Sequence, residues 1–446
     1  MKFNIQTISF ADNQKLSIVK IKEIKNRIFL EKRYYGGVLR VLLENDPYFY
    51  RQIFFHNHKN IPMLSIHELK QESNRISSIL FYITHKCNMY CNICYENAGK
   101  NDPKKEVSIK DIKRVITNVK GKYIVLLGGE PTLKKSIFRI IKLIVKTGNI
   151  PSIHTNGIKL ANLEYAKKLK KSGLDVVHLS FNSFSDHINE KINNMSLSRI
   201  KLKALENIRK VGMKAILSTN VIKNINEDEI AKLINLMLNN NDFIKGIFLR
   251  PMLHGGRINL NIKDELTISD IAKRIEKETN KKISRQHFVE NRKLRINMFK
   301  IAKIFWGEKA ANKFLPEIAL SVLLYKEGNA WKTYPEIEIL KKLNKLMGKV
   351  NNKKELIINS IKNLPWLLKF VFQKMTLRIS FSLIKHKCEM ALVANDLLHH
   401  KNVVRIWIDV IQTPKNVDLL NPSRTYLFNS SGNITPIVLL YGIGPT

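Results

Sequence analysis

The sequence has few cysteines and no long apolar runs. Its 446 residues contain four cysteines, too few for the disulfide framework of a small secreted protein, and this usage suits a reducing cytosol. No stretch reaches the ~18 uncharged apolar residues expected of a membrane-spanning helix. The first residues, Met1-Lys2-Phe3-Asn4-Ile5, lack the apolar core of a signal peptide. We therefore expect a cytoplasmic protein.

Acidic residues are also scarce. The chain has 37 Asp and Glu against 76 Lys and Arg, a formal net charge of +39. Such a surplus favours polyanionic partners, namely RNA, anionic lipid head groups or an acidic protein. The alternative is compositional bias, because Lys, Asn and Ile are abundant throughout and the lysines form no single block. No RNA-recognition motif stands out, so nucleic acid is not the expected partner, whereas an anionic membrane surface stays a candidate.

Three of the four cysteines, Cys87, Cys91 and Cys94, stand together in the spacing C-x3-C-x2-C. Cysteine thiolates are the preferred ligands of iron–sulfur clusters and zinc. With no fourth cysteine nearby, a [4Fe–4S] cubane held here keeps one iron open for a small molecule. The alternative is a zinc knuckle with His85 as a fourth ligand. Cys388 stands alone, and we expect a buried thiol there.

Residues 77–261 alternate between short apolar segments and amphipathic ones. Six such units predict a parallel sheet covered by helices, and six are too few for a closed eight-stranded barrel. The predicted fold is therefore α/β, a partial (βα)6 barrel. The expected strands are Ile79–Ile83, Tyr123–Leu127, Ser152–His154, Asp175–Leu179, Lys214–Ser218 and Gly246–Leu249.

Distinctive residues follow each of these strands. In barrels of this kind, ligands bind at the carboxyl ends of the strands. The cysteine loop follows the first strand, and polar or glycine-rich residues follow the other five: Gly128, Gly129 and Glu130; Thr155 and Asn156; Ser180 and Asn182; Asn220; and Arg250. We therefore expect one site along this edge.

The cysteine loop, the Gly128-Gly129-Glu130 motif and Thr155-Asn156-Gly157 together resemble the radical SAM superfamily. The resemblance implies a [4Fe–4S] cluster on the three cysteines and S-adenosylmethionine (SAM) on its open iron. It also implies reductive cleavage of SAM to a 5′-deoxyadenosyl radical that abstracts a substrate hydrogen. One residue departs from the family pattern, because Ile93 stands where an aromatic residue usually precedes the third cysteine.

The resemblance assigns cofactor-binding roles to the strand-end residues. Gly128, Gly129 and Glu130 would hold the SAM amino group, with Thr155 and Asn156 beside them. Ser180, Asn182 and Asn220 would contact the SAM ribose or carboxylate, and Arg250 the SAM carboxylate or a substrate anion. Polar residues at strand ends also cap following helices in many proteins, so the residues themselves leave both roles open for Ser180, Asn182 and Asn220.

The flanking regions are less distinctive. Residues 1–76 predict a small lead-in subdomain with a strand at Leu16–Ile21, a turn at Gly36-Gly37 and a strand or helix at Val38–Leu43. Residues 262–446 predict a helix-rich, basic α+β region that covers the substrate or contacts a membrane.

Within the C-terminal region, we expect a helix opened by Thr267 and Asp270 and helical periodicity across 295–347. Strands are expected at 403–410 and, after a turn at 430–433, at 434–440. Residues 364–375 interleave apolar residues with lysines, a composition that fits an interfacial membrane helix. Such an apolar stripe more often belongs to a helix packed in the protein core, and we expect residues 364–375 to form a core helix.

The C-terminal half resembles archaeal-type radical SAM enzymes of the tetraether-lipid synthase and methanopterin methylase group. The likeness lies in residues 250–257, 266–279 and 411–418, Gly432 and Pro436, without the cysteines that hold auxiliary clusters in that group. The leading hypothesis is a single-cluster radical SAM enzyme with a flavodoxin- or ferredoxin-like electron donor. Its substrate is a small molecule, a lipid or a peptide, and it is lipid-like if the C-terminal region binds lipid. The alternatives are a peptide-modifying maturase and a non-catalytic RNA- or membrane-associated protein. The expected location is cytoplasmic, with attachment to the inner face of the membrane as a candidate.

Overall fold

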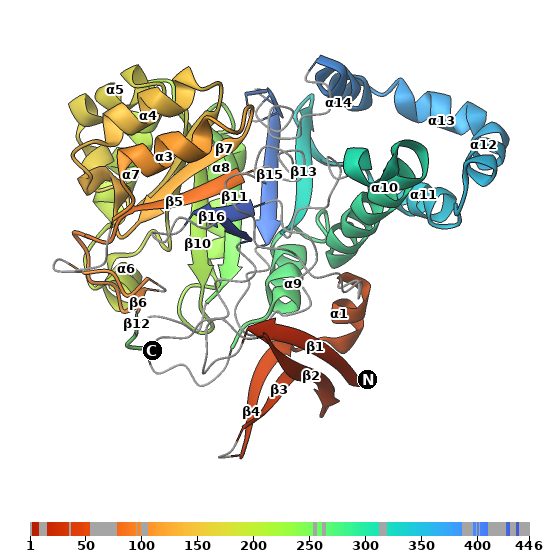
Figure 1. Cartoon of the computed structure of the whole chain (residues 1–446), viewed down its shortest axis with the longest axis horizontal. Coiled ribbons are helices and arrows are strands. Elements are labelled where there is room, and N and C mark those ends of the chain that lie inside the picture. The colour runs from red at the N-terminus through yellow and green to blue at the C-terminus, as the bar shows by residue number, and fades with distance from the viewer. Residues whose placement is uncertain are drawn as a thin grey trace.

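A computed structural model of the chain describes residues 2–8, 16–34, 37–53, 78–94, 96–99, 106–252, 257–260, 265–311, 319–385, 396–397, 399–400, 402–408, 425–428 and 434–436. The predicted turns at 36–37 and 430–433 and the lone Cys388 fall wholly or partly outside these residues. Figure 1 shows a large central sheet with helices along one side, a small sheet near the amino terminus and a helical extension at the far side.

The central sheet is built on six consecutive parallel strands, which confirms the predicted α/β fold. They lie side by side in chain order: β5 (Ser78–Thr84), β7 (Tyr123–Gly128), β8 (Ile150–Thr155), β9 (Val176–Ser180), β10 (Lys214–Val221) and β11 (Ile244–Pro251). The connecting helices are α3 (Ile109–Ile116), α4 (Ile137–Lys146), α5 (Leu163–Lys171), α6 (Asp186–Asn193), α7 (Ser198–Lys210) and α8 (Glu229–Asn239). α6 was not predicted.

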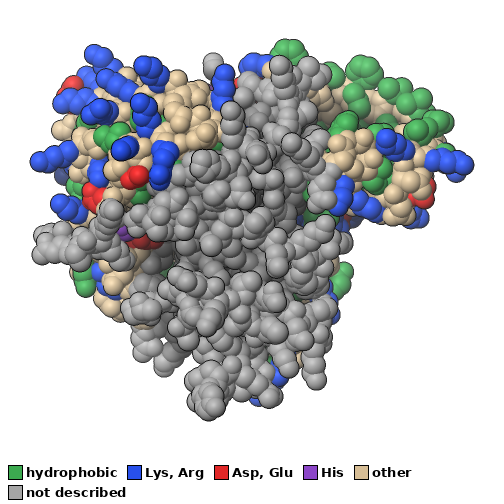
Figure 2. Space-filling view, in the orientation of Figure 1, with side chains coloured by type: hydrophobic (Ala, Val, Ile, Leu, Met, Phe, Trp, Pro, Cys, Tyr) green, Lys and Arg blue, Asp and Glu red, His purple; other side chains and the backbone are tan. Residues whose placement is uncertain are grey.

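Strand alternation separates the two faces of this sheet. Ile153, Val177 and Leu217 are fully buried in the core shared with the helices, so their neighbours in sequence point to the opposite, inward face. That core rests on Ile140 and Ile144 of α4 and on equivalent residues of the other helices. Lysines and arginines are spread over the outer surface near α3, α4 and α5 (Figure 2).

Strands from the carboxyl-terminal region extend the sheet at both edges. β15 (Val403–Ile408) pairs parallel with β11, followed by the antiparallel strands β13 (Leu320–Glu327) and β14 (Ala330–Tyr334). At the other edge, β16 (Thr425–Phe428) pairs parallel with β5, and β17 (Ile434–Pro436) pairs with β16. The last part of the chain therefore flanks both edges of the six-stranded unit.

The expected helical run over residues 295–347 is wrong in its middle. α10 (Arg285–Ala311) and α11 (Ile337–Gly348) are helices, but β13 and β14 form a hairpin between them. Gly328, with a φ of 59°, lies in the turn. Alternating Leu320, Val322 and Leu324 are buried in the core, which is the period of a strand rather than a helix.

The amino-terminal region forms an antiparallel sheet of β1 (Lys2–Ile8), β2 (Leu16–Ile24), β3 (Arg27–Tyr34) and β4 (Gly37–Glu44), followed by α1 (Pro47–Ile53). The segment at 38–43 is therefore a strand. Lys25 and Asn26 have positive φ angles of 47° and 56°, as a tight two-residue hairpin turn requires.

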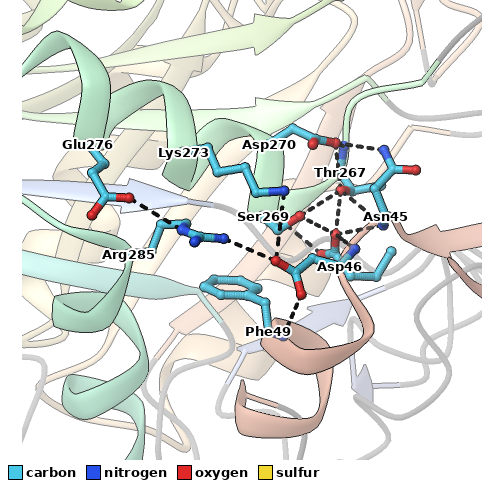
Figure 3. A network of polar contacts seen from close by, with 10 residues as sticks. Asn45, Asp46, Phe49, Thr267, Ser269, Asp270, Lys273, Glu276 and Arg285 are labelled. Atoms are coloured by element: carbon cyan, nitrogen blue, oxygen red, sulfur yellow. Dashed lines mark hydrogen bonds and ion pairs between the residues drawn. The ribbon is translucent and has the colours of Figure 1, made fainter. Parts of the chain in front are cut away.

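A buried polar network joins this small sheet to α9 (Ile268–Glu278). Figure 3 shows the network from close by. The Glu44 carboxylate is fully buried and accepts hydrogen bonds from the Ser269 hydroxyl at 2.5 Å and the Asn45 backbone at 2.8 Å. Thr267 and Asp270 form a capping box at the start of α9, where a helix was predicted to begin. Arg285 reaches Asp46 at 3.0 Å, so four segments of the chain meet here.

Candidate active site

The cysteine loop begins where β5 ends. Cys87, Cys91 and Cys94 are all half-buried free thiols within eight residues of one another. Burial raises the pKa of the Cys87 thiol to about 12 and also raises that of Cys91. A bound iron atom would counter this cost, because coordination stabilises the thiolate.

The donor set fits a three-thiolate cluster. Within the described ranges, no three His, Cys, Asp or Glu side chains surround one metal-ion position. Cysteine thiolates are the donors that iron–sulfur clusters use, and three of them would leave one iron of a [4Fe–4S] cluster to another ligand.

Arg257, which follows the last of the six parallel strands, contacts the cysteine loop that follows the first. Its guanidinium is 3.6 Å from the Tyr90 ring centroid, and its Nε donates to the Cys91 carbonyl at 2.8 Å. It also donates to the Ala98 carbonyl at 3.1 Å. The short strand β12 (Arg257–Ile258) pairs with β6 (Ile93–Cys94), so Arg257 bridges the loop and the segment that follows β11.

The two glycines after β7 allow that loop to lie directly against the cysteine loop. A Cβ on Gly128, whose φ is +147°, would stand 2.0 Å from the Thr84 carbonyl oxygen, and one on Gly129 would stand 2.4 Å from the Lys86 carbonyl oxygen. The backbone N–H groups of Gly129 and Glu130 donate to those same two carbonyls at 2.9 and 2.8 Å. Glycine is thus required by a backbone-to-backbone contact.

The Glu130 carboxylate joins the ends of β7 and β8. It is 1% exposed and accepts hydrogen bonds from the Thr132 backbone at 3.0 Å, the Thr155 hydroxyl at 2.7 Å and the Asn156 backbone at 2.7 Å. The Asn156 side chain in turn donates to Asn88 in the cysteine loop at 2.8 Å. Four of the predicted residues or motifs are therefore connected.

A second group of amides links the cysteine loop to β9 and β10. Asn193 of α6 donates to the Cys91 Sγ at 3.5 Å, and Asn182 donates to Asn193 at 3.2 Å. The Asn182 side-chain oxygen accepts from the Asn220 backbone at 3.1 Å. The structure thus gives Asn182 a role in holding strand ends together, rather than capping a helix.

Lys201 of α7 was not among the residues predicted from the sequence. Its ammonium group is buried and donates to the backbone carbonyls of Asn156 and Ser180, the latter at 2.6 Å. Burial lowers its pKa to about 8, while Glu130 and Cys91 act in the opposite direction. Lys201 therefore places a positive charge beside the anionic groups of the site, and only its tertiary contacts distinguish it from the chain's other lysines.

The inward face of the sheet carries polar and aromatic groups below these loops. The His154 and His178 rings stack with centroids 4.4 Å apart, and burial together with nearby Arg250 lowers the pKa of His178 to about 4. The Arg250 guanidinium lies 5.7 Å from the Phe248 ring centroid. Neutral imidazoles and a cation can hydrogen-bond a polar substrate group here. Neither histidine was among the predicted site residues.

Residues 81–237 match the family model of the radical SAM superfamily. This match bears out the resemblance to that family predicted from the three motifs. Members of this superfamily use a [4Fe–4S] cluster and SAM.

Two curated relatives are similar to part of this chain. One is the 7,8-dihydro-6-hydroxymethylpterin dimethyltransferase of Methanocaldococcus jannaschii, 33% identical over 215 residues, or 46% of this chain and 42% of the relative. The other is a probable GTP 3′,8-cyclase of Thermoplasma volcanium, 31% identical over 168 residues, or 36% of this chain and 50% of the relative. The matches thus span half or less of each relative.

Among solved structures, Streptococcus suis SuiB bound to S-adenosylmethionine aligns over 48% of this chain and 50% of its own, at 19% identity and a TM-score of 0.40. A structure of methylornithine synthase aligns over 48% of this chain and 67% of its own, at 14% identity and a TM-score of 0.37.

Proposed function

We propose that this protein is a radical SAM enzyme with one [4Fe–4S] cluster held by Cys87, Cys91 and Cys94. The observation that carries the proposal is the direct backbone contact between the cysteine loop and the Gly128-Gly129-Glu130 loop. When bound, the cluster and SAM supply a 5′-deoxyadenosyl radical that abstracts a substrate hydrogen. A flavodoxin- or ferredoxin-like protein would deliver the electron.

The chain's own residues would position SAM rather than react with it. Glu130 and Asn156 fix the ends of β7 and β8, and Asn182 fixes those of β9 and β10. Glu130 Oε2 is the carboxylate oxygen with the fewer protein donors, which leaves it able to accept from an ammonium group. Lys201 offsets the negative charge of this region.

The proposed substrate has a polar end and an unactivated alkyl part. The inward-facing His154, His178 and Arg250 suit a polar or anionic group, while Tyr82, Leu80 and Val125 form an apolar cluster elsewhere on the same face. A carbon radical route is what an unactivated C–H bond requires. A lipid-like molecule could place its polar end at the histidines and Arg250 and its alkyl part at the apolar cluster. We propose this class of substrate.

The test is anaerobic reconstitution with iron and sulfide, followed by a reductant and SAM. We expect iron incorporation, a cluster absorbance band and 5′-deoxyadenosine. Replacing all three clustered cysteines with alanine should abolish all three, whereas Cys388→Ala, the matched control, should retain them. Iron-free protein after reconstitution would favour a non-catalytic binding protein.

Substrate class is tested separately, once SAM cleavage is measured. Stimulated 5′-deoxyadenosine release by a polar lipid would support the proposal. Stimulation by a peptide instead would favour a maturase, and stimulation by a pterin would favour the activity named for the Methanocaldococcus relative.

A further inference from the structure

Three consecutive helices form an extension that we call the helical arm, residues 353–385. They are α12 (Lys353–Lys362), α13 (Leu364–Val371) and α14 (Lys374–Lys385), and Figure 1 shows them at the upper right, beyond α11. Contacts from both α13 and α14 anchor the arm. Lys342 of α11 lies 4.4 Å from the Trp366 ring centroid, and Thr376 hydrogen-bonds the Tyr334 hydroxyl.

The arm exposes its apolar side chains instead of burying them. Neither α12 nor α13 has a buried residue, so the expectation of a core helix is wrong for 364–371, although Met375 at the end of the predicted range is buried. Figure 2 shows hydrophobic side chains gathered over this part of the surface. The exposed set is Ile357, Ile358, Ile361, Leu364, Leu368, Val371, Phe372, Leu377 and Phe381, with Ile361, Phe372 and Phe381 at 66, 68 and 70%.

The spacing of these residues places them on one side of each helix. Leu364, Leu368 and Val371 follow the i, i+4, i+7 pattern, as Leu377 and Phe381 follow i, i+4. In α14, the opposite side packs on the protein through Met375, which is 5% exposed. The exposed Leu377 and Phe381 of α14 are therefore not needed to attach this helix to the protein, because Met375 on its other side already does so.

The charge of the arm is strongly one-sided. Glu355 is its single acidic residue, against seven basic ones: Lys353, Lys354, Lys362, Lys369, Lys374, Arg378 and Lys385. Five of them, Lys353, Lys354, Lys362, Lys369 and Lys385, are exposed. This surface thus combines exposed aliphatic and Phe side chains with lysines.

We propose that the helical arm docks on the surface of an anionic lipid bilayer. Helices that lie in a membrane interface combine an apolar face with lysines that reach anionic head groups. A protein partner would predict a different composition, because lysine is depleted in protein interfaces. No described helix is long and apolar enough to cross a membrane, so the arm would lie along the surface.

The test is flotation of the full-length protein with vesicles of phosphatidylcholine alone or mixed with phosphatidylglycerol. We expect binding to the mixed vesicles that weakens as salt increases. Because each lysine near an anionic surface is worth about a fivefold change in binding, Lys362→Glu with Lys369→Glu should lower partitioning by at least about 25-fold. Phe372→Gln with Phe381→Gln should also release the protein.

The matched control is Leu202→Gln on α7, an exposed leucine at 46% on the barrel helices, which should bind as the unaltered chain does. Circular dichroism verifies that every variant keeps its helices. Equal vesicle binding by the arm variants and the control would overturn the proposal. So would a dimer that the Phe372→Gln, Phe381→Gln variant converts to a monomer, because a second copy would then cover the arm.

This proposal stands apart from catalysis. Cleavage of SAM by the reconstituted protein in the absence of vesicles depends on the cysteine loop, and the arm variants should retain it. A protein that binds vesicles but never cleaves SAM would refute the proposed function. The proposal that the helical arm docks on a membrane would still stand.

Discussion

At the scale of single residues, the site depends on glycines that permit close backbone contact. We predict that Gly128→Ala loses at least about 2 kcal/mol of unfolding free energy, since a Cβ there would overlap the Thr84 carbonyl oxygen and such overpacking typically costs roughly 1–3 kcal/mol. Iron incorporation should fall with it. Chemical denaturation and iron analysis measure both effects.

The control for this substitution is Gly212→Ala. Gly212 also has a positive φ, +69°, but no atom lies within 4 Å of the position that an added Cβ would take, so it isolates backbone strain from steric overlap. We expect a loss of about 1 kcal/mol there, with iron incorporation unchanged. Equal effects at the two glycines would mean that the contact with Thr84 contributes nothing.

Arg257 provides the second prediction at this scale. Arg257→Ala removes the hydrogen bonds to the Cys91 and Ala98 carbonyls and the contact with Tyr90. Groups that orient metal ligands typically account for roughly 10–100-fold in metal affinity, so we expect iron retention against a chelator to fall by about tenfold or more. Arg51→Ala, at an exposed ion pair with Glu23, should leave retention unchanged; a similar loss in both variants would contradict the role of Arg257.

At the scale of elements, the junction of β4 and α9 should respond to pH. Burial raises the pKa of Glu44 from 4.5 to about 7. Between these values the unfolded chain has released this proton while the folded chain still holds it, so stability falls as pH rises from about 4.5 to 7. The loss is on the order of 3 kcal/mol at pH 8 relative to pH 4 for this group.

Denaturant unfolding at several pH values, comparing the unaltered chain with Glu44→Gln, isolates this contribution. The variant should be the less pH-dependent of the two across that window. Glu23→Gln is the control, since Glu23 lies in an exposed ion pair on the same small sheet. An identical pH profile for all three proteins would mean that Glu44 ionises normally.

Elements also show what the sequence could and could not predict. The six parallel strands and the start of a helix at Thr267 were predictable because local periodicity and spacing determine them. The hairpin of β13 and β14 was missed because Val322-Leu323-Leu324-Tyr325 is a continuous apolar run, which hides the two-residue period of a strand. The position of 364–375 could not be predicted, since an apolar stripe has the same pattern whether protein or lipid covers it. Arg257, Lys201 and Asn193 were missed because their contacts join segments distant in sequence.

At the scale of the whole molecule, the carboxyl-terminal strands complete the sheet. In the pairing of β15 with β11, Arg405 lies opposite Gly246 and Ile408 lies opposite Leu249. The β15 side chains of Val404, Ile406 and Ile408 are buried. We predict that a chain ending at residue 261 aggregates, because the edge of β11 would then be open for pairing with other chains. Size-exclusion chromatography of the two lengths measures this; a monomeric short chain with the same unfolding midpoint would contradict it.

The position of β16 has a consequence for synthesis. β5, which leads into the cysteine loop, has β7 on one side and residues 425–428 on the other. The ribosome makes β5 more than three hundred residues before it makes β16, so β5 emerges first. The strand that leads into the cysteine loop therefore keeps one edge unpaired until residues 425–428 have been synthesised.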